Sequence, residues 1–269
     1  MELFILCLET KDQALSIRFD SAPGRQDEQK PPEGGFIICS AVMSFKTTQH
    51  INGYRMDLVI MGMVIMNNKE HWEKVYGTKA PDAVSWYAPH LETSLNLIHQ
   101  ATTNRGAAII DIGGGEATLV DDLLAEGYQD ISVLDISQKA IDVARDRIGK
   151  QADKVHWYCA DITQATLPQN YFEVWHDRAV FHFLTEEVQR EKYVEQVMRS
   201  VKHGGYVIMS TFGPEGPEKC SGLDVVRYDA ENLHGQFGKT FKLIKSTTEL
   251  HQTPMGTTQQ FLYCFCRME

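Results

Sequence analysis

The sequence predicts an α/β fold in which helices and strands form packed layers, and three observations lead to it. From about residue 90 onward, short apolar runs typical of strands alternate with segments whose apolar residues recur at helical spacing. With 269 residues, of which 43% are hydrophobic, the chain is long enough to bury one complete core. In residues 109–116, an apolar run ends in an acid and three glycines, and a helical pattern follows. A strand that turns into a helix in this way is a basic unit of layered α/β folds.

The first 65 residues differ in composition from the rest. Residues 20–35 are rich in Pro, Gly, Gln and charged residues, a composition typical of linkers. Residues 58–66 are apolar but only nine residues long, which is too short to span a membrane. We therefore expect a poorly structured extension over residues 1–65 and a single domain over residues 66–269.

Each element of that domain is predicted from its local pattern. The segment that begins at Lys69 carries Trp72, Val75 and Tyr76 at helical spacing, and a second helix is predicted after the loop over residues 81–89. Strands are predicted over residues 107–112, 131–135, 155–160, 172–175 and 206–210, followed by an antiparallel pair over residues 241–249 and 259–266. Further helices are predicted over residues 117–125, from Ser137 onward, over residues 186–201 and over residues 230–237.

Capping residues predict where some of these helices begin and end. Ser137 precedes an apolar stripe at helical spacing and is a suitable N-cap. Thr185 is expected to cap the helix over residues 186–201. Gly204 and Gly205 are expected to end that helix before the next strand begins.

The turn after the first strand of the predicted sheet indicates a ligand site. Asp111 lies near the end of that strand, and Gly113, Gly114 and Gly115 bring bare backbone N–H groups up against a ligand. Asp135 closes the second strand, where an acid usually holds the hydroxyls of a ribose. The sequence therefore predicts a cofactor that contains a nucleoside.

The glycine turn does not fit a dinucleotide well. The dinucleotide fingerprint, placed on Gly113 and Gly115, requires a third glycine where this chain has Thr118. The sequence also lacks the G-x4-G-K-[ST] pattern of a P-loop. An NAD-dependent oxidoreductase and a catalytically inactive cofactor-binding module stay as alternative interpretations.

Over residues 69–269 the chain resembles the class I, Rossmann-like S-adenosylmethionine-dependent methyltransferases. Residues 111–115 match the first motif of that family, and Asp135 matches its ribose-binding acid. Asp161 and Ile162 match the pair that holds adenine. Residues 175–178 lie where members of the family have residues that face the methyl group and the substrate. The resemblance implies a three-layer α/β sandwich with a mostly parallel seven-stranded sheet and a C-terminal antiparallel strand pair.

Two subgroups of the family share further features with this chain. The motif over residues 177–181 is similar to that of elongation-factor lysine methyltransferases. Thiopurine or thiol methyltransferases carry a Trp-Asp-Arg-like sequence there, which His176 interrupts in this chain. The start with Trp72 and Tyr76 is most similar to uncharacterised bacterial-type class I members. The resemblance implies S-adenosylmethionine as cofactor but leaves the methyl acceptor open between a small molecule and a protein side chain, lysine included.

The resemblance also implies roles for individual residues. Asp135 is expected to accept hydrogen bonds from the ribose hydroxyls, and Asp161 from the adenine amino group. The expected cofactor-binding residues are Trp72, Asp111, Gly113, Gly114, Gly115, Asp135, Ile136, Asp161, Ile162 and Asp177.

Two residues are candidates for a direct part in catalysis. Asp177 is expected near the transferred methyl group, although it could instead pair with Arg178 or cap the following turn. His182 is a candidate general base because its unperturbed pKa suits that task. Since it lies between Phe181 and Phe183, a core position is the alternative interpretation for His182.

Charge and cysteine content exclude several function classes. The formal net charge of -10 disfavours binding to nucleic acid, which depends on clustered cations. The six cysteines show no C-x2-C pairing, and we expect no metal site and a reducing, cytoplasmic environment. No secretory signal or membrane partner is expected, and the sequence does not predict an oligomeric state.

Overall fold

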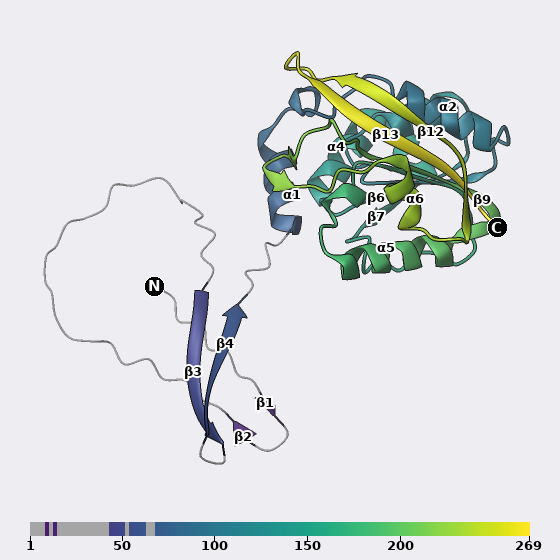
Figure 1. Cartoon of the computed structure of the whole chain (residues 1–269). Coiled ribbons are helices and arrows are strands. Elements are labelled where there is room, and N and C mark those ends of the chain that lie inside the picture. The colour runs from purple at the N-terminus through teal and green to yellow at the C-terminus, as the bar shows by residue number, and fades with distance from the viewer. Residues whose placement is uncertain (1–8, 11–12, 15–42, 52–53, 63–67) are drawn as a thin grey trace, which may run out of the picture. The chain divides into compact units, whose positions relative to one another are not determined.

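The computed structural model describes residues 9–10, 13–14, 43–51, 54–62 and 68–269 (Figure 1). The chain divides into two compact units, Met1–Val64 and Ile65–Glu269. In the first unit, β1 (Glu9–Thr10) pairs antiparallel with β2 (Gln13–Ala14), and β3 (Met43–Ile51) with β4 (Tyr54–Gly62). Most of residues 1–65 lie outside the described part of the chain, so the expectation of a poorly structured extension stays a prediction.

A seven-stranded sheet in the order β12-β13-β9-β8-β5-β6-β7 forms the centre of the second unit. Its strands are β5 (Ala108–Ile112), β6 (Asp130–Asp135), β7 (Val155–Cys159), β8 (Phe172–Arg178), β9 (Val201–Phe212), β12 (Phe241–Gln252) and β13 (Thr258–Met268). The five strands from β9 to β7 are parallel to one another, whereas β13 runs antiparallel to both β9 and β12. The predicted mostly parallel sheet with a C-terminal antiparallel pair is confirmed.

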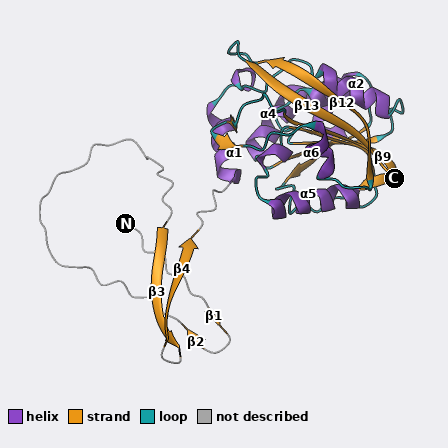
Figure 2. Ribbon diagram, in the orientation of Figure 1, coloured by secondary structure: helices purple, strands orange, loops and turns teal. Residues whose placement is uncertain are grey.

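Two hydrophobic cores cover the two faces of this sheet. Along β5, Ile110 and Ile112 belong to one core and Ile109 to the other, because successive strand residues point to opposite faces. The first core packs under α5 (Glu187–Ser200) and α6 (Ala230–Gly235), and the second under α2 (Glu92–Ala101) and α3 (Leu119–Ala125). Figure 2 shows α2 and α5 on opposite sides of the sheet, which is the predicted three-layer arrangement.

The remaining elements of the second unit are short. They are α1 (Asn68–Thr78), α4 (Gln138–Ile148), the 3-10 turns η1 (Pro81–Ala83), η2 (Gly149–Lys154) and η3 (Phe181–Phe183), and the small hairpin β10 (Lys219–Cys220) and β11 (Leu223–Asp224). Ser137 caps α4 as predicted, since its Oγ accepts a hydrogen bond from the backbone N–H of Ala140 at 3.3 Å. None of the described helices is long and apolar enough to cross a membrane.

Two predicted boundaries of the helix α5 were wrong. Thr185 does not cap α5; Glu186 is the N-cap and forms a capping box with Gln189. The helix ends at Ser200 without help from the two glycines, which lie inside β9. A Cβ on Gly205 would lie 2.8 Å from the carbonyl oxygen of Lys202, so the bend in this strand requires glycine there.

The strand β8 is longer than predicted. It extends through His176 and Asp177 to Arg178, beyond the predicted end at Trp175. His176 and Asp177 are polar, but both are fully buried and hydrogen bonded. Buried polar groups of this kind interrupt the apolar pattern by which a strand is recognised in sequence.

Candidate active site

The glycine turn after β5 has a backbone that only glycine fits. Gly113 has a φ of +71°, and its N–H donates to the carbonyl oxygen of Leu134 at 2.6 Å. A Cβ at this position would overlap Cγ2 of Val180. A Cβ on Gly115 would lie 2.7 Å from that of Ala140. The turn therefore holds β5, α4 and the segment after β8 close together with bare backbone between them.

Asp135 lies at the end of β6 directly beside this turn. Its carboxylate accepts backbone N–H groups from Ser137 at 2.8 Å and from Gly115 at 3.2 Å. Burial raises the pKa of Asp135 to about 6, although these two hydrogen bonds favour the ionised form. The side chain is thus held in one orientation as a strong acceptor at the cavity wall.

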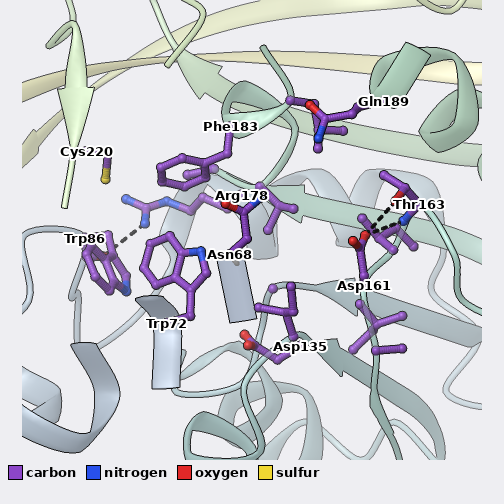
Figure 3. Close-up of a pocket in the computed structure, with 18 of the residues that line it drawn as sticks. Asn68, Trp72, Trp86, Asp135, Asp161, Thr163, Arg178, Phe183, Gln189 and Cys220 are labelled. Atoms are coloured by element: carbon purple, nitrogen blue, oxygen red, sulfur yellow. Dashed lines mark hydrogen bonds between the residues drawn. The ribbon is translucent and has the colours of Figure 1, made fainter. Parts of the chain in front are cut away.

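A cavity extends from Asp135 along the ends of the parallel strands (Figure 3). This is the edge where open α/β sheets bind ligands. One end is lined by residues that follow β6 and β7, and the other end by aromatic residues. The lining residues are Asn68, Trp72, Tyr76, Trp86, Gly113, Leu134, Asp135, Ile136, Ala160, Asp161, Ile162, Thr163, Arg178, Ala179, Val180, Phe183, Leu184, Gln189, Phe212, Cys220 and Phe261.

The polar end of the cavity is built by a tight turn after β7. Oδ1 of Asp161 accepts from both the backbone N–H and the hydroxyl of Thr163, each at 2.8 Å. This turn fixes the carboxylate next to Ile162, whose side chain is buried in the core. Ile136 lines the same end. The structure therefore brings Asp135, Ile136, Asp161 and Ile162 to one place.

The other end is a chamber of aromatic rings, which we call the aromatic chamber: Trp72, Tyr76, Trp86, Phe183, Phe212 and Phe261, together with Arg178 and Cys220. The ring of Trp72 lies 5.1 Å from that of Phe183 and 5.8 Å from that of Trp86, both in edge-to-face geometry. In Figure 3 the Arg178 guanidinium lies between Cys220 and the two tryptophan rings. The cavity thus joins a polar end to a largely apolar one.

A second, smaller cavity lies along the glycine turn. Asp111, Gly114 and Glu116 contribute to its lining, and Gly113 and Arg178 line both cavities. Glu116 is only 5% exposed, and neither of its carboxylate oxygens has a hydrogen-bond partner among the described residues. Burial raises the pKa of Glu116 to about 7, against the opposing field of Arg147. Oδ2 of Asp111 is likewise buried without a partner.

A buried chain of hydrogen bonds links Asp111 to Arg178. Oδ1 of Asp111 lies 2.6 Å from Nδ1 of His176, whose Nε2 lies 2.8 Å from the Ser94 hydroxyl. The Ser94 hydroxyl lies 3.4 Å from the Tyr263 hydroxyl, which accepts from Nε of Arg178 at 3.2 Å. All five side chains belong to buried or nearly buried residues. This series of hydrogen bonds fixes Asp111, next to the glycine turn, and Arg178, in the wall of the aromatic chamber, relative to each other.

The two candidate catalytic residues lie outside the lining of both cavities. Asp177 is fully buried, accepts from the Tyr193 hydroxyl at 2.5 Å and from the backbone N–H of Val180 at 2.8 Å, and so caps the turn after β8. Nδ1 of His182 accepts from the backbone N–H of Phe212 at 3.3 Å. Burial, reinforced by Arg178, lowers the pKa of His182 to about 3, so the ring is neutral. The catalytic roles of both residues stay predictions.

Several site residues were not found by sequence reasoning. Arg178, Glu116 and Thr163 contribute to the cavities, yet each was assigned no ligand role. Thr163 follows Asp161 in the Asx-turn spacing, which is a usable sequence signal. Arg178 belongs to the segment 175–178 that the family resemblance places near the substrate, although no role was assigned to it individually. Glu116 had no such signal, because its burial depends on contacts with distant segments. Among the described residues, no cluster of three or more His, Cys, Asp or Glu side chains has the arrangement of a metal site.

Comparison with known proteins identifies a methyltransferase domain within the chain. The family model described as a methyltransferase domain matches residues 109–205. The eEF1A lysine and N-terminal methyltransferases of Bos taurus and Homo sapiens are each 29% identical to the chain over 140 residues. Those matches cover 52% of this chain but only 20% of each relative, so the chain spans about a fifth of the length of these curated proteins.

Solved structures share the fold. One, described as "Conversion of a Disulfide Bond into a Thioacetal Group during Echinomycin Biosynthesis", has a TM-score of 0.61 at 17% identity and covers 75% of this chain and 93% of that one. The N-methyltransferase NodS from Bradyrhizobium japonicum WM9, in complex with S-adenosyl-L-homocysteine, has a TM-score of 0.59 at 13% identity. The match covers 76% of this chain and 99% of the NodS chain. The family model thus identifies a methyltransferase domain over residues 109–205. The solved structures show that the fold around it is shared with S-adenosylmethionine-dependent methyltransferases.

Proposed function

We propose that this domain transfers a methyl group from S-adenosylmethionine to a small-molecule nucleophile bound in the aromatic chamber. The observation that carries the proposal is the single cavity that joins Asp135 and Asp161 to the aromatic chamber. S-adenosylmethionine supplies an activated methyl group on a sulfonium. The protein then has to place the two reactants in line and exclude water.

The residues at the polar end fit the nucleoside part of this cofactor. Asp135 offers a fixed carboxylate to the two ribose hydroxyls, and such charge-assisted hydrogen bonds are stronger than neutral ones. Asp161 and Ile162 offer a carboxylate and an apolar surface to adenine. Gly113 lines the cavity with bare backbone, which allows the ligand to approach the turn closely.

The second cavity fits the amino-acid part of the cofactor. Glu116 and Asp111 together leave three buried carboxylate oxygens without a partner among the described residues. Such groups are costly to bury unless a cation pairs with them. The α-ammonium of the cofactor is a cation of that kind, and we assign Glu116 and Asp111 to it.

Lysine methylation is the second candidate, because relatives that match the chain are named as lysine methyltransferases. A lysine substrate arrives as an ammonium and has to lose a proton before it can attack the methyl group. The aromatic chamber contains a guanidinium, and the only carboxylates in the lining are those of Asp135 and Asp161 at the other end. This charge distribution favours a small molecule over lysine.

Calorimetric titration of the full chain with S-adenosylmethionine, S-adenosylhomocysteine and NAD tests the cofactor. We expect the first two to bind and NAD not to bind. D135A should abolish S-adenosylhomocysteine binding, whereas D146A, which alters an exposed acid on α4, should leave it unchanged. Binding of NAD alone would contradict the proposal.

Incubation of a cell extract with methyl-labelled cofactor and the protein separates the two acceptor classes. Label in small molecules supports the first candidate, and label in protein supports the second. Nucleic acid should stay unlabelled, because the net charge of the chain is -10. A cytoplasmic location is part of the same proposal, and fractionation of cells that express a tagged chain tests it.

A further inference from the structure

Arg178 places a positive charge in the wall of the aromatic chamber. Its side chain is only 6% exposed, and it lines the cavity next to Trp86 and Cys220 (Figure 3). The guanidinium also lies 4.3 Å over the ring of Phe261. Burial of a charged group is costly, so a cation at this place needs partners that offset the loss of water.

The partners of Arg178 hold it in place but do not use all of its hydrogen-bonding capacity. Nε donates to the Tyr263 hydroxyl at 3.2 Å, one terminal nitrogen donates to the Trp86 carbonyl at 3.0 Å, and the other to Glu249 at 3.4 Å. A guanidinium has five N–H donors, so two of them have no partner among the described residues. The carboxylate of Glu249 is 23% exposed, and its contact with Arg178 is long. It therefore offsets only part of the charge.

The other titratable groups that face Arg178 carry no negative charge at neutral pH. Burial raises the pKa of the Cys220 thiol to about 12, and burial also raises the pKa of Tyr263. Burial lowers the pKa of His182 to about 3 and the pKa of His251 below its usual value, so both rings are neutral. Of the titratable groups that face Arg178, only Glu249 therefore offsets part of the guanidinium charge.

We propose, on the basis of the methyl-transfer function above, that the acceptor is an apolar, ring-sized thiol or phenol that binds as its anion next to Arg178. The aromatic walls would bury the apolar body, and the free N–H donors of Arg178 would face the thiolate or phenolate. An opposite charge within about 4–6 Å favours the ionised form of an acid. The acceptor thus loses its proton to solvent when it binds.

This charge arrangement accounts for the transfer step without a protein base. The lone pair of the thiolate sulfur or phenolate oxygen forms a bond to the methyl carbon, and the bond from that carbon to the sulfonium sulfur breaks. The electron pair of the broken bond stays on the sulfur, which becomes a neutral thioether, and no proton moves in this step. The burial of Asp177 and His182 outside the cavity lining agrees with such a step.

Coloured acids test the proposal on the full chain saturated with S-adenosylhomocysteine. The probes are 4-nitrophenol and 4-nitrothiophenol, whose anions absorb in the visible range, and benzylamine serves as the cationic counterpart. We expect the pH at which each bound probe ionises to fall by about 1–2 relative to solution. Benzylammonium should bind at least tenfold more weakly than 4-nitrophenolate.

Variants locate the effect at Arg178. R178M should abolish the change in probe ionisation, and R178K should retain part of it. R105M is the matched control, because Arg105 also lies over an aromatic ring, at 4.2 Å from Tyr128, but does not line the cavity. R178M removes contacts with Trp86 and Glu249, so its S-adenosylhomocysteine affinity and its thermal unfolding are measured first. If that variant does not fold, the comparison of 4-nitrophenolate and benzylammonium binding to the wild type decides the question.

The outcomes separate this inference from the proposed function. If S-adenosylhomocysteine does not bind the wild type, the proposed function fails. If it binds but the probes ionise as in solution, or benzylammonium binds as tightly as the anion, the acceptor class proposed here is wrong.

Discussion

Glutamine at position 116 should make the free protein more stable and its ligand binding weaker. Glu116 is buried, and its carboxylate oxygens have no partner among the described residues. Burial raises the pKa of this carboxyl from 4.5 to about 7. A difference of that size between the folded and unfolded states corresponds to about 3 kcal/mol above both pKa values, and we take this as an upper bound.

The sign of the pH dependence follows from the raised pKa. The folded state binds the proton more tightly than the unfolded state, so ionisation of Glu116 lowers the free energy of unfolding as the pH rises from 4.5 through 7. Glutamine removes that term. We expect E116Q to gain about 1–3 kcal/mol at pH 8 and almost nothing at pH 4. For a domain of this size, each kcal/mol corresponds to a rise in Tm of about 2–4 °C.

Urea denaturation of the wild type and E116Q between pH 4 and 8 measures this gain. E195Q is the control, because Glu195 is an exposed acid on α5. E116Q should also lose affinity for S-adenosylhomocysteine but not for 5′-methylthioadenosine, which lacks the amino-acid part. A gain in stability that does not depend on pH, or an equal loss for both ligands, would refute the reasoning.

Three further predictions follow from the geometry of the site. G113A should lower the free energy of unfolding by about 2–4 kcal/mol, because φ is +71° and the new Cβ overlaps Val180. Urea denaturation measures this loss, and the double variant G113A/V180A should recover part of it. S-adenosylhomocysteine affinity should fall as the pH drops through about 6, where Asp135 takes up a proton. In calorimetry, D135N should bind weakly and lack this step at about pH 6. Y193F should cost about 1–3 kcal/mol of stability, since Asp177 loses a buried donor, yet leave ligand affinity within about twofold; a large loss of affinity would instead place Asp177 in the site.

The residues that could be predicted from the sequence are those with a local cause. The turn at Gly113 requires a backbone with positive φ, and Asp135 and Asp161 lie at strand ends, where the topology of a parallel sheet brings them together. The layered α/β class followed from the alternation of strands and helices, whereas the mostly parallel seven-stranded sheet was implied by the family resemblance. Each of these signals lies within a few residues of the chain.

The residues that could not be predicted depend on contacts across the fold. Asp177 and Arg178 are adjacent and oppositely charged, so pairing between them was a reasonable alternative. In β8 their side chains point to opposite faces of the sheet. Asp177 therefore pairs with Tyr193 of α5, and Arg178 with Glu249 and Tyr263 of the antiparallel strands. No pattern near residue 178 indicates strands that lie about 70 residues further along the chain.

A crystal structure of the full chain with S-adenosylhomocysteine tests the central claim most directly. The account predicts that the ribose contacts Asp135, that adenine lies against Asp161 and Ile162, and that the amino group contacts Glu116 or Asp111, with the aromatic chamber left for the acceptor. A nucleoside bound away from Asp135, or an amino-acid part that occupies the chamber around Trp72 and Arg178, would contradict it.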